Sequence, residues 1–551
     1  MTKMLPSPFE NAWPAPPRDS KLAARPSAPR IDWSPGTLQL VLTRQLPGCQ
    51  TIVVSNREPY IHNRENGKTA LQTPASGVVS ALEPVMRAGG GTWIAHGSGS
   101  ADRETSDHRG RLSVPPHSPA YTLRRIWLTA EEQEGYYLGF ANEGLWPLCH
   151  IAFVRPTFRE PDWNHYRAVN QRFANAVVEE ARQEDPIVLV QDYHLALVPH
   201  MVREKLPKAT IITFWHIPWP SAEAFGVCPW KAEILQGLLA STILGFHTPW
   251  QCTNFMATAE RFTGSRIDYE NFSVTQGGSK TLVKPYPISI EPAPAALTRQ
   301  KPIDMCRQQV RRDLGLSEET HLSVGVERLD YTKGIPERLQ AVDAFLTRHP
   351  EWKGRFALLQ ATAPSRSTLQ AYKDLQKKVI ALADTINSKH RVGDFKPIRL
   401  VIRHHDQDEV FKLLRAADSC LVTSLHDGMN LVAKEFVAAH DDGLGVLILS
   451  SFAGASRELT EALIVNPYDI EELGESIYRA AMMSKAEKRE RMRSMRTVVR
   501  HNNVYRWAGQ MLLDAASVRK RERVVEFSVP NRVGITGGAR RLLEGQHTAQ
   551  P

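Results

Sequence analysis

Short apolar runs alternate along the chain with longer stretches in which apolar residues recur at helical spacing. The runs in the first half cover residues 51–56, 186–192, 209–216 and 242–248. Those in the second half cover residues 321–330, 355–364, 397–405, 417–425, 445–451 and 462–467. Such continuous runs are typical of parallel strands buried on both faces, and the helical stretches between them are typical of βαβ crossovers. The pattern predicts an α/β protein with two doubly wound, Rossmann-like domains.

Prolines and polar tracts set the expected domain boundaries. Residues 286–297 (YPISIEPAPAAL) interrupt both periodicities, so we expect one domain at 36–290 and another at 291–500. An amphipathic stretch predicts a last helix at 501–518. Residues 1–35 contain eight prolines, and we expect them to form a disordered arm, with a flexible tail at 530–551.

Composition narrows the class of protein. The chain has 551 residues and a net charge of +9, from 68 basic and 59 acidic residues. Much of the excess lies in basic runs at 485–501 and 519–523, which we interpret as solvated helix faces because no nucleic-acid-reading motif accompanies them. Six cysteines are scattered without a CxxC pair, and there is neither a signal-peptide core nor an apolar run of about 18 residues. We expect a reduced, cytoplasmic protein without a zinc site, a membrane span or a nucleic-acid partner.

Polar side chains recur where the apolar runs end. Taken along the chain, they are Arg57, Asp192, His216, Arg328, Lys333 and Arg366. In open α/β sheets ligands bind beyond the carboxyl ends of strands, so these residues predict a cleft between the domains that holds an anion. Arg328 and Lys333 can both reach one pyrophosphate. The structural alternatives are ion-paired surface arginines, a solvated lysine, a satisfied core histidine and, for Asp192, a helix N-cap.

The stretch HDGMNLVAKE (426–435) gives a more specific signal. Gly428 allows the backbone to approach a ligand, and a helix that starts near Asn430 offers free N–H groups to phosphate. Glu435 lies four residues after Leu431 and therefore on the same helix face, where it can bind a ribose diol. The alternative is that Asp427 or Asn430 only caps the helix.

Several enzyme classes are disfavoured by missing motifs. The chain has no GxxxxGK[ST] phosphate loop, no GxGxxG after a predicted strand and no GxSxG nucleophile elbow. It also lacks an Asp-x-Asp pair placed after a strand to hold a metal-bound nucleotide. Kinase-like, nicotinamide-dependent and serine-hydrolase chemistry are therefore not expected.

Eight motifs together resemble one known family. VVSNR, QDYH, WHIPWP, VERLDYTKG, APSR, LHDGMNLVAKEF, SFAGA and ALIVNPYD occur in this order over about 50–515. They are similar to the trehalose-6-phosphate synthase family, whose members are retaining glycosyltransferases of the two-domain GT-B fold, with two parallel sheets facing a central cleft. The resemblance implies transfer of glucose from UDP-glucose to glucose 6-phosphate, without metal or cofactor. It also implies that 36–290 binds the acceptor, that 291–500 binds the nucleotide sugar and that the 501–518 helix crosses back.

The resemblance also implies roles for individual residues. Catalysis would rest on His216, Asp427, Arg328 and Lys333. The donor would be bound by Ser76, Gly77, His216, Arg328, Lys333, His405, Asp427, Gly428, Met429, Asn430, Leu431 and Glu435. The acceptor would be bound by Arg57, Tyr137, Trp146, Asp192 and Arg366. The aromatic residues of the acceptor set have the alternative of being ordinary core.

The chain departs from the family pattern at several of these places. Ala75-Ser76-Gly77 replaces a glycine-glycine loop, and a charged insertion (EPYIHNRENGKTALQTP) separates it from Arg57. Trp219, His405 and His426 replace a phenylalanine, an aromatic residue and an arginine that are common in the family. Three alternatives therefore stay open: another phosphorylated acceptor such as glycerol 3-phosphate, a GDP- or ADP-linked donor, and a non-catalytic regulatory homologue. A homo-oligomer is also left open.

Overall fold

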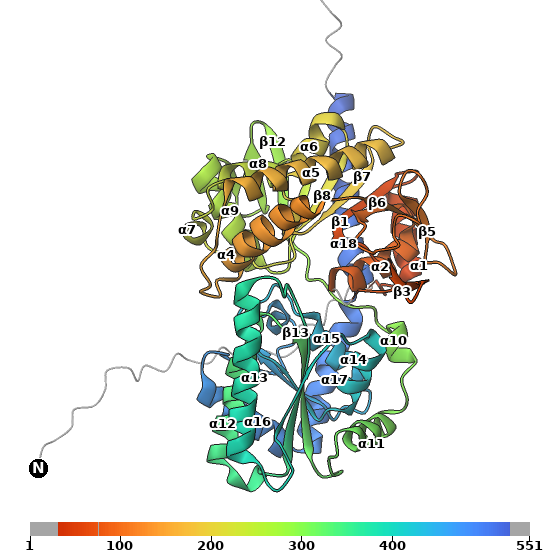
Figure 1. Ribbon diagram of the computed structural model, residues 1–551. Helices are drawn as coiled ribbons and strands as arrows, with labels where there is room; N and C mark the ends of the chain where they lie inside the picture. Colours follow the sequence, from red (N-terminus) through yellow and green to blue (C-terminus); the bar gives the residue numbers. More distant parts are fainter. Residues whose placement is uncertain (1–30, 75–76, 529–551) are drawn as a thin grey trace, which may run out of the picture. The chain divides into compact units, whose positions relative to one another are not determined.

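The computed structural model describes residues 31–74 and 77–528, and two large sheets organise them (Figure 1). The first sheet consists of β1 (Thr51–Arg57), β4 (Thr92–His96), β5 (Arg111–Val114), β6 (Tyr121–Ile126), β7 (Ile187–Gln191), β8 (Thr210–Phe214), β9 (Ile243–Phe246), β10 (Arg266–Asp268), β11 (Ser273–Gln276) and β12 (Ser279–Pro285). The second consists of β13 (His321–Arg328), β14 (Phe356–Ala363), β15 (Ile398–Ile402), β16 (Ser419–Val422), β17 (Val446–Ser450) and β18 (Leu463–Val465). Every apolar run noted in the sequence is one of these strands.

The two sheets repeat the same strand order. The second sheet runs β15-β14-β13-β16-β17-β18, and all of its strand pairs are parallel. The first has a parallel centre in the order β6-β4-β1-β7-β8-β9, extended at its edges by β5 and by β12-β11-β10. In each sheet the order reverses beside the first strand, at β13/β16 and at β1/β7. Such reversal points are where doubly wound sheets bind ligands.

Helices cover both faces of the sheets. Those in the first half are α1 (Pro35–Gln45), α2 (Gly77–Gly89), α3 (Ala130–Glu132), α4 (Trp146–His150), α5 (Glu160–Glu180), α6 (Val198–Lys205), α7 (Ala222–Phe225), α8 (Lys231–Leu239) and α9 (Pro249–Thr263). Those in the second half are α10 (Ala295–Thr298), α11 (Ile303–Asp313), α12 (Ile335–Arg348), α13 (Gln370–His390), α14 (Gln407–Ala416), α15 (Leu431–Ala439), α16 (Ile470–Met482), α17 (Lys485–His501) and α18 (Val504–Ser528). A π-helix, η1 (Gln133–Leu145), precedes α4, and 3-10 turns occur at η2 (Tyr193–Leu195), η3 (Tyr331–Lys333), η4 (Pro350–Trp352) and η5 (Gly454–Arg457).

The alternation of side chains along β1 shows how the core is built. Val53 packs into a cluster with α1, α2 and α18, whereas Ile52 and Val54 pack into a second cluster with α5, α6 and α8. All three are almost fully buried, so β1 has no solvent face. This explains why the strand is continuously apolar in sequence.

The amino-terminal boundary differs from the prediction. Trp33 is 6% exposed and packs so closely on Gly509 that a Cβ there would lie 2.0 Å from the indole. Ser34 caps α1, which begins at Pro35. The expected disordered arm at 1–35 therefore extends too far, because the indole of Trp33 anchors the chain on α18. Residues 1–30 and the expected tail at 530–551 lie outside the described residues.

Helix α18 and the junction segment link the two halves of the chain. α18 is longer than the expected 501–518 helix, and it contacts α1, α2, β8 and β9 of the first half (Figure 1). It begins beside the junction segment, where the Val504 amide donates to the carbonyl of Ile290 (3.0 Å). The division into domains at residue 290 stays a prediction.

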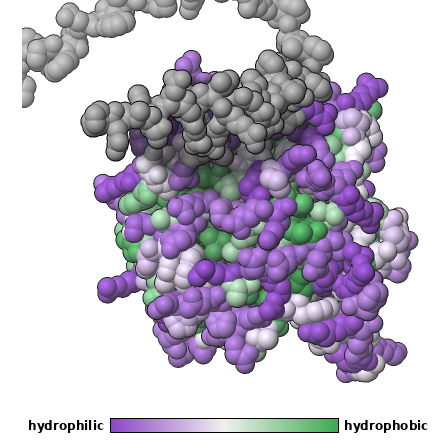
Figure 2. All heavy atoms as spheres, turned by 90° about the horizontal axis from the view of Figure 1, so that it is seen from above, coloured by the Kyte–Doolittle hydropathy of each residue, from purple (hydrophilic) through white to green (hydrophobic). Residues whose placement is uncertain are grey.

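The face of the molecule seen from above is mostly polar. In Figure 2 hydrophilic residues cover most of the visible face, with hydrophobic ones in small patches between them. Among the described helices, none is long and apolar enough to cross a membrane.

Candidate active site

A cavity of about 340 Å³ lies at the reversal points of both sheets. Its walls come from the ends of β1, β7 and β8 in the first sheet and of β13, β14 and β16 in the second, with η1, α4 and α15. The sequence-predicted residues that line it are Arg57, Gly77, Tyr137, Trp146, Asp192, His216, Arg328, Lys333, Arg366, His405, Asp427, Met429, Asn430, Leu431 and Glu435. Residues far apart in sequence therefore meet in one place, as the strand-end argument expects.

Lys333 and Asp427 form the centre of the second-sheet wall. Lys333 Nζ lies 2.6 Å from Asp427 Oδ2, and both side chains are largely buried. Asn430 Nδ2 and Ser424 Oγ each donate to the same carboxylate oxygen at 3.1 Å. Burial alone would raise the pKa of Asp427, but Lys333 and these donors outweigh it and lower the pKa. Asp427 is therefore a fixed anion, and Lys333 is not the solvated lysine of the structural alternative.

The turn before α15 leaves no room for a larger residue at position 428. A Cβ on Gly428 would lie 2.1 Å from the carbonyl oxygen of His216, so the turn packs directly on the end of β8. Gly428 itself does not line the cavity; its role is this close approach. Asn430 then adopts a left-handed conformation (φ 73°) before α15 starts at Leu431. Leu431 and Val432 at the start of α15 line the cavity, and the first amides of a helix have no intrahelical partners.

Glu435 is a buried carboxyl for which the described residues supply no hydrogen-bond or ion-pair partner. It is 8% exposed, and burial raises its pKa to about 7. Among the described residues it takes part in no hydrogen bond or ion pair, although it lines the cavity. A buried carboxyl in this state is costly unless a ligand donates to it.

Arg328 has no carboxylate partner in the described part of the chain. The adjacent carboxylate of Glu327 pairs instead with the buried Arg338 and accepts from Gln360 Nε2 (2.6 Å). The Arg328 guanidinium lies 5.5 Å from the ring centre of Trp146. An unpaired arginine at the end of β13 favours a ligand anion over a surface ion pair.

Arg366 is held from several sides. It pairs with Asp330 (3.1 Å), contacts the Tyr372 hydroxyl and lies 4.1 Å from the ring centre of Trp146. Its backbone is left-handed (φ 45°). Burial would raise the pKa of Asp330, but Arg366, Arg328 and Lys333 outweigh it and lower the pKa to about 2. The ion-pair alternative for Arg366 is thus correct in part, yet the guanidinium still reaches the cavity.

Arg57 and Tyr137 form the opposite wall. Arg57 Nη2 donates to the Tyr137 hydroxyl at 3.4 Å, and the Tyr137 ring stacks on His194 (ring centres 5.5 Å apart, 12° between planes). Burial would raise the pKa of Tyr137, but the guanidinium groups of Arg57, Arg366 and Arg328 lower it to about 7. This region of the cavity therefore has a positive electrostatic character that favours a ligand anion.

Asp192 and His216 connect the ends of β7 and β8. Asp192 Oδ1 accepts from the amides of Tyr193 (2.9 Å) and His216 (3.1 Å), with its own backbone left-handed (φ 74°). It does cap η2, as the structural alternative holds, but it also lines the cavity. Burial raises the pKa of Asp192 to about 7 and lowers that of His216 well below its usual range. His216 Nε2 lies 2.9 Å from Gln191 Oε1, and the neutral ring is fixed in place.

Ser76 and His405 are the remaining residues of the predicted donor site. Ser76 lies outside the described residues. His405 is 5% exposed, and its Nδ1 lies 3.0 Å from Glu409 Oε2, so its ring is oriented by α14.

Some lining residues were not singled out from the sequence. They include His150, Gln191, His194 and His247. His150 ends α4 directly after the π-helix, and its Nδ1 lies 2.9 Å from the Trp146 carbonyl. A π-helix has no apolar period that the helix or strand templates detect, which explains why His150 was missed. Gln191 and His194 belong to the QDYH motif, and His247 lies at the end of the apolar run 242–248, so their positions after strands were the available signal. Among the described residues, no group of three or more His, Cys, Asp or Glu is placed to hold a metal ion.

Two Rossmann-like sheets with a cation-lined cavity at their reversal points are typical of glycosyltransferases of the GT-B class. The model of glycosyltransferase family 20 matches residues 49–517, and the chain belongs to this family. The trehalose-6-phosphate synthase of Mycolicibacterium smegmatis is 36% identical over 470 residues, which are 84% of this chain and 91% of that protein.

Solved structures agree with the sequence comparison. An E. coli trehalose-6-phosphate enzyme bound with UDP-2-fluoro glucose superposes with a TM-score of 0.75 at 32% identity, over 85% of this chain and 99% of that one. An α,α-trehalose-phosphate synthase (UDP-forming) from Burkholderia xenovorans, in complex with glucose 6-phosphate, gives 0.76 at 30% identity over the same shares. The GT-B fold expected from the sequence is confirmed.

Proposed function

We propose that this chain transfers glucose from UDP-glucose to glucose 6-phosphate, releasing UDP and forming trehalose 6-phosphate with retention at the transferred carbon. The observation that supports this best is the concentration of four cationic side chains in one cavity. Lys333 pairs with Asp427 in the turn before α15, Arg57 donates to Tyr137, and Arg328 and Arg366 both lie against Trp146. In this proposal Arg328 and Lys333 hold a diphosphate, and Arg57 and Arg366 hold a sugar phosphate. The family and its sugar-bound relatives support the same reaction.

The donor binds along the second-sheet wall in this proposal. The diphosphate lies against Arg328, Lys333 and the free amides at the start of α15, where the helix dipole also favours negative charge. Glu435, one turn further along, accepts hydrogen bonds from the ribose hydroxyls. This partner would account for a buried carboxyl that is otherwise unsatisfied.

The transferred glucose and the acceptor meet between the walls. Asp427 accepts from hydroxyls of the transferred glucose, and the neutral His216 lies beside it. The acceptor phosphate lies between Arg57 and Arg366, with Tyr137 donating to it, while Asp192 accepts from an acceptor hydroxyl. An unphosphorylated sugar would leave these guanidinium groups without an anion, so phosphate is required for good binding.

The chemical step needs no protein nucleophile in this proposal. The bond between the glucose anomeric carbon and the diphosphate oxygen breaks while the acceptor hydroxyl oxygen bonds to that carbon from the same face. The departing diphosphate oxygen takes the proton of the acceptor hydroxyl. The protein therefore contributes by positioning both sugars and by stabilising the negative charge that develops on the diphosphate, through Arg328, Lys333 and the α15 amides. We propose that no metal takes part, because these cations neutralise the diphosphate.

A donor and acceptor screen tests the proposal. UDP-, GDP- and ADP-glucose are each paired with glucose 6-phosphate, glucose and glycerol 3-phosphate, and release of the nucleoside diphosphate is measured. UDP-glucose with glucose 6-phosphate should give the highest kcat/KM. A higher value for GDP- or ADP-glucose, or for glycerol 3-phosphate, would reassign the substrate. If no pair releases a nucleoside diphosphate, the result would favour a regulatory homologue and contradict the proposal that the chain is an enzyme.

A further inference from the structure

Side-chain directions reverse at the end of β1. Arg57 is exposed to the cavity, whereas the next residue, Glu58, points inward and is 1% exposed. Glu58 follows the last residue of β1 directly, so its backbone is joined to that of Arg57. Whatever holds Glu58 in the interior therefore also restrains the backbone from which the Arg57 side chain reaches the cavity.

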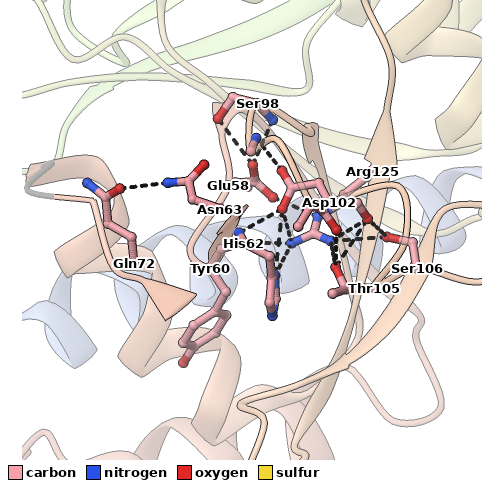
Figure 3. Close-up of polar contacts among 12 residues, drawn as sticks. Glu58, Tyr60, His62, Asn63, Gln72, Ser98, Asp102, Thr105, Ser106 and Arg125 are labelled. Carbon is pink, nitrogen blue, oxygen red and sulfur yellow. Dashed lines mark hydrogen bonds and ion pairs between the residues drawn. The ribbon is translucent and has the colours of Figure 1, made fainter. Parts of the chain in front are cut away.

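Glu58 is held by a buried arginine from β6. Arg125 is 0% exposed, and its Nε lies 2.7 Å from Glu58 Oε2 (Figure 3). The other Glu58 oxygen accepts from the amide and hydroxyl of Ser98, at 2.8 and 3.2 Å. Among the described residues Glu58 thus has fixed partners on both oxygens, and none of them lines the cavity.

Arg125 also fixes the chain that follows Glu58. Its Nη2 donates to the Tyr60 carbonyl and lies 2.8 Å from His62 Nδ1. The same nitrogen lies 2.9 Å from Asp102, whose carboxylate accepts from the amides of His62 (2.8 Å) and Gly99 (2.6 Å). Figure 3 shows these groups, from the insertion and from the loop after β4, converging on the guanidinium that β6 supplies. The backbone path that follows β1 is therefore fixed over several residues.

The cluster contains two carboxyl groups for one guanidinium. Burial, followed by the hydrogen bond with Asp102, raises the pKa of Glu58 to about 8. Burial and Arg125 lower the pKa of His62, so the imidazole is neutral at neutral pH. A buried ionic cluster of this kind is weak evidence for a gain in stability, and its best-supported use elsewhere is to fix one geometry among several.

We propose that Glu58 and Arg125 are positioning residues for the acceptor: by holding the residue after Arg57, they direct the Arg57 guanidinium toward the acceptor phosphate. This inference rests on the proposed function for the identity of the ligand, but the orientation of Arg57 is a property of the unliganded protein. Because Arg57 lowers the pKa of Tyr137 from 3.4 Å away, Tyr137 reports that orientation without any substrate.

The first experiment is a spectrophotometric titration of the Tyr137 phenol, isolated by subtracting the Tyr137→Phe variant. Glu58→Ala and Arg57→Ala should both raise the Tyr137 pKa, by about one unit or more for loss of an adjacent cation. Glu58→Gln, which keeps an oxygen for Arg125, should raise it less. Glu180→Ala is the matched control, because Glu180 is a buried carboxyl paired with Arg111 and Arg124 of the same sheet and does not line the cavity.

The second experiment distinguishes a loss of Arg57 orientation from a general loss of structure. Glu58→Ala should raise the KM for glucose 6-phosphate roughly tenfold and change the KM for UDP-glucose by less than twofold. In an Arg57→Ala background the same substitution should have no further effect on the acceptor KM. An unshifted Tyr137 titration in folded Glu58→Ala or Glu58→Gln, or an additive effect in the double variant, would overturn the inference. Failure of transfer in the wild type would contradict only the proposed function, since the titration needs no turnover.

Discussion

Replacing Tyr137 by phenylalanine should change how acceptor binding depends on pH. The ordinary tyrosine pKa is 10.0, and in the unliganded site the three nearby guanidinium groups lower it to about 7 against the effect of burial. Three pKa units correspond to about 4 kcal/mol in favour of the charged phenolate. Above pH 7 the phenolate neutralises part of the positive charge that the acceptor phosphate requires. The phosphate, whose second pKa is about 6, is by then a dianion and binds best to the protonated phenol.

Two measurements check this argument. The kcat/KM for glucose 6-phosphate should fall about tenfold per pH unit above 7 in the wild type. Calorimetry at pH 8 in buffers of different ionisation enthalpy should show uptake of about one proton on acceptor binding. The Tyr137→Phe variant should bind the acceptor roughly ten- to hundredfold more weakly at pH 6.5, for loss of a charge-assisted hydrogen bond. The kcat/KM of this variant should then rise with pH to a plateau, because burial raises the pKa of Asp192 to about 7 and its carboxyl ionises around that pH. A decrease in the kcat/KM of this variant above pH 7 would refute the assignment of the alkaline decrease to Tyr137.

Other substitutions distinguish residues that bind the donor from residues that bind the acceptor. Arg366→Ala should raise the KM for glucose 6-phosphate at least tenfold with a smaller change for UDP-glucose, and Lys333→Ala should do the reverse, each measured by UDP release. An equal change in both KM values would contradict the division. Gly428→Ala should lower both kcat and the melting temperature, at a cost of about 1–3 kcal/mol, because a Cβ would lie 2.1 Å from the His216 carbonyl oxygen; unchanged values would argue against that contact. EDTA should leave the rate of UDP release unchanged, and a loss restored by a divalent cation would contradict the metal-free proposal.

Sequence patterns predicted the interior of the fold better than its edges. β1 and β13 are buried along most of their length, and such runs between helical stretches leave few alternatives to a buried parallel strand. By contrast the edge strands β10 and β5 are only three and four residues long, so neither produces a continuous run. Short edge strands take much of their stability from tertiary pairing, which local sequence does not encode.

The candidate site shows the same limit. Arg328 and Lys333 were predicted from their position after a strand, but their partners were not. Whether an arginine pairs with the adjacent Glu327 depends on Arg338, which comes from the following helix and takes that carboxylate. The predicted end of the amino-terminal arm at residue 35 was also wrong. The indole of Trp33 packs on a helix some 470 positions away, a contact that no local pattern encodes.

Three of the left-handed residues at the cavity have a consequence for engineering. Asp192, Arg366 and Asn430 each hold a backbone conformation that costs a non-glycine residue roughly 1–2 kcal/mol. Glycine at any of them would relax the backbone while removing a carboxylate, a guanidinium or an amide from the cavity. At Arg366 the exchange would also leave the buried Asp330 without its ion pair, so relief is expected only at Asp192 and Asn430; a variant library selected for heat resistance alone would drift toward glycine at those two positions and lose turnover. Selection for both properties should retain all three side chains and find its stabilising substitutions elsewhere.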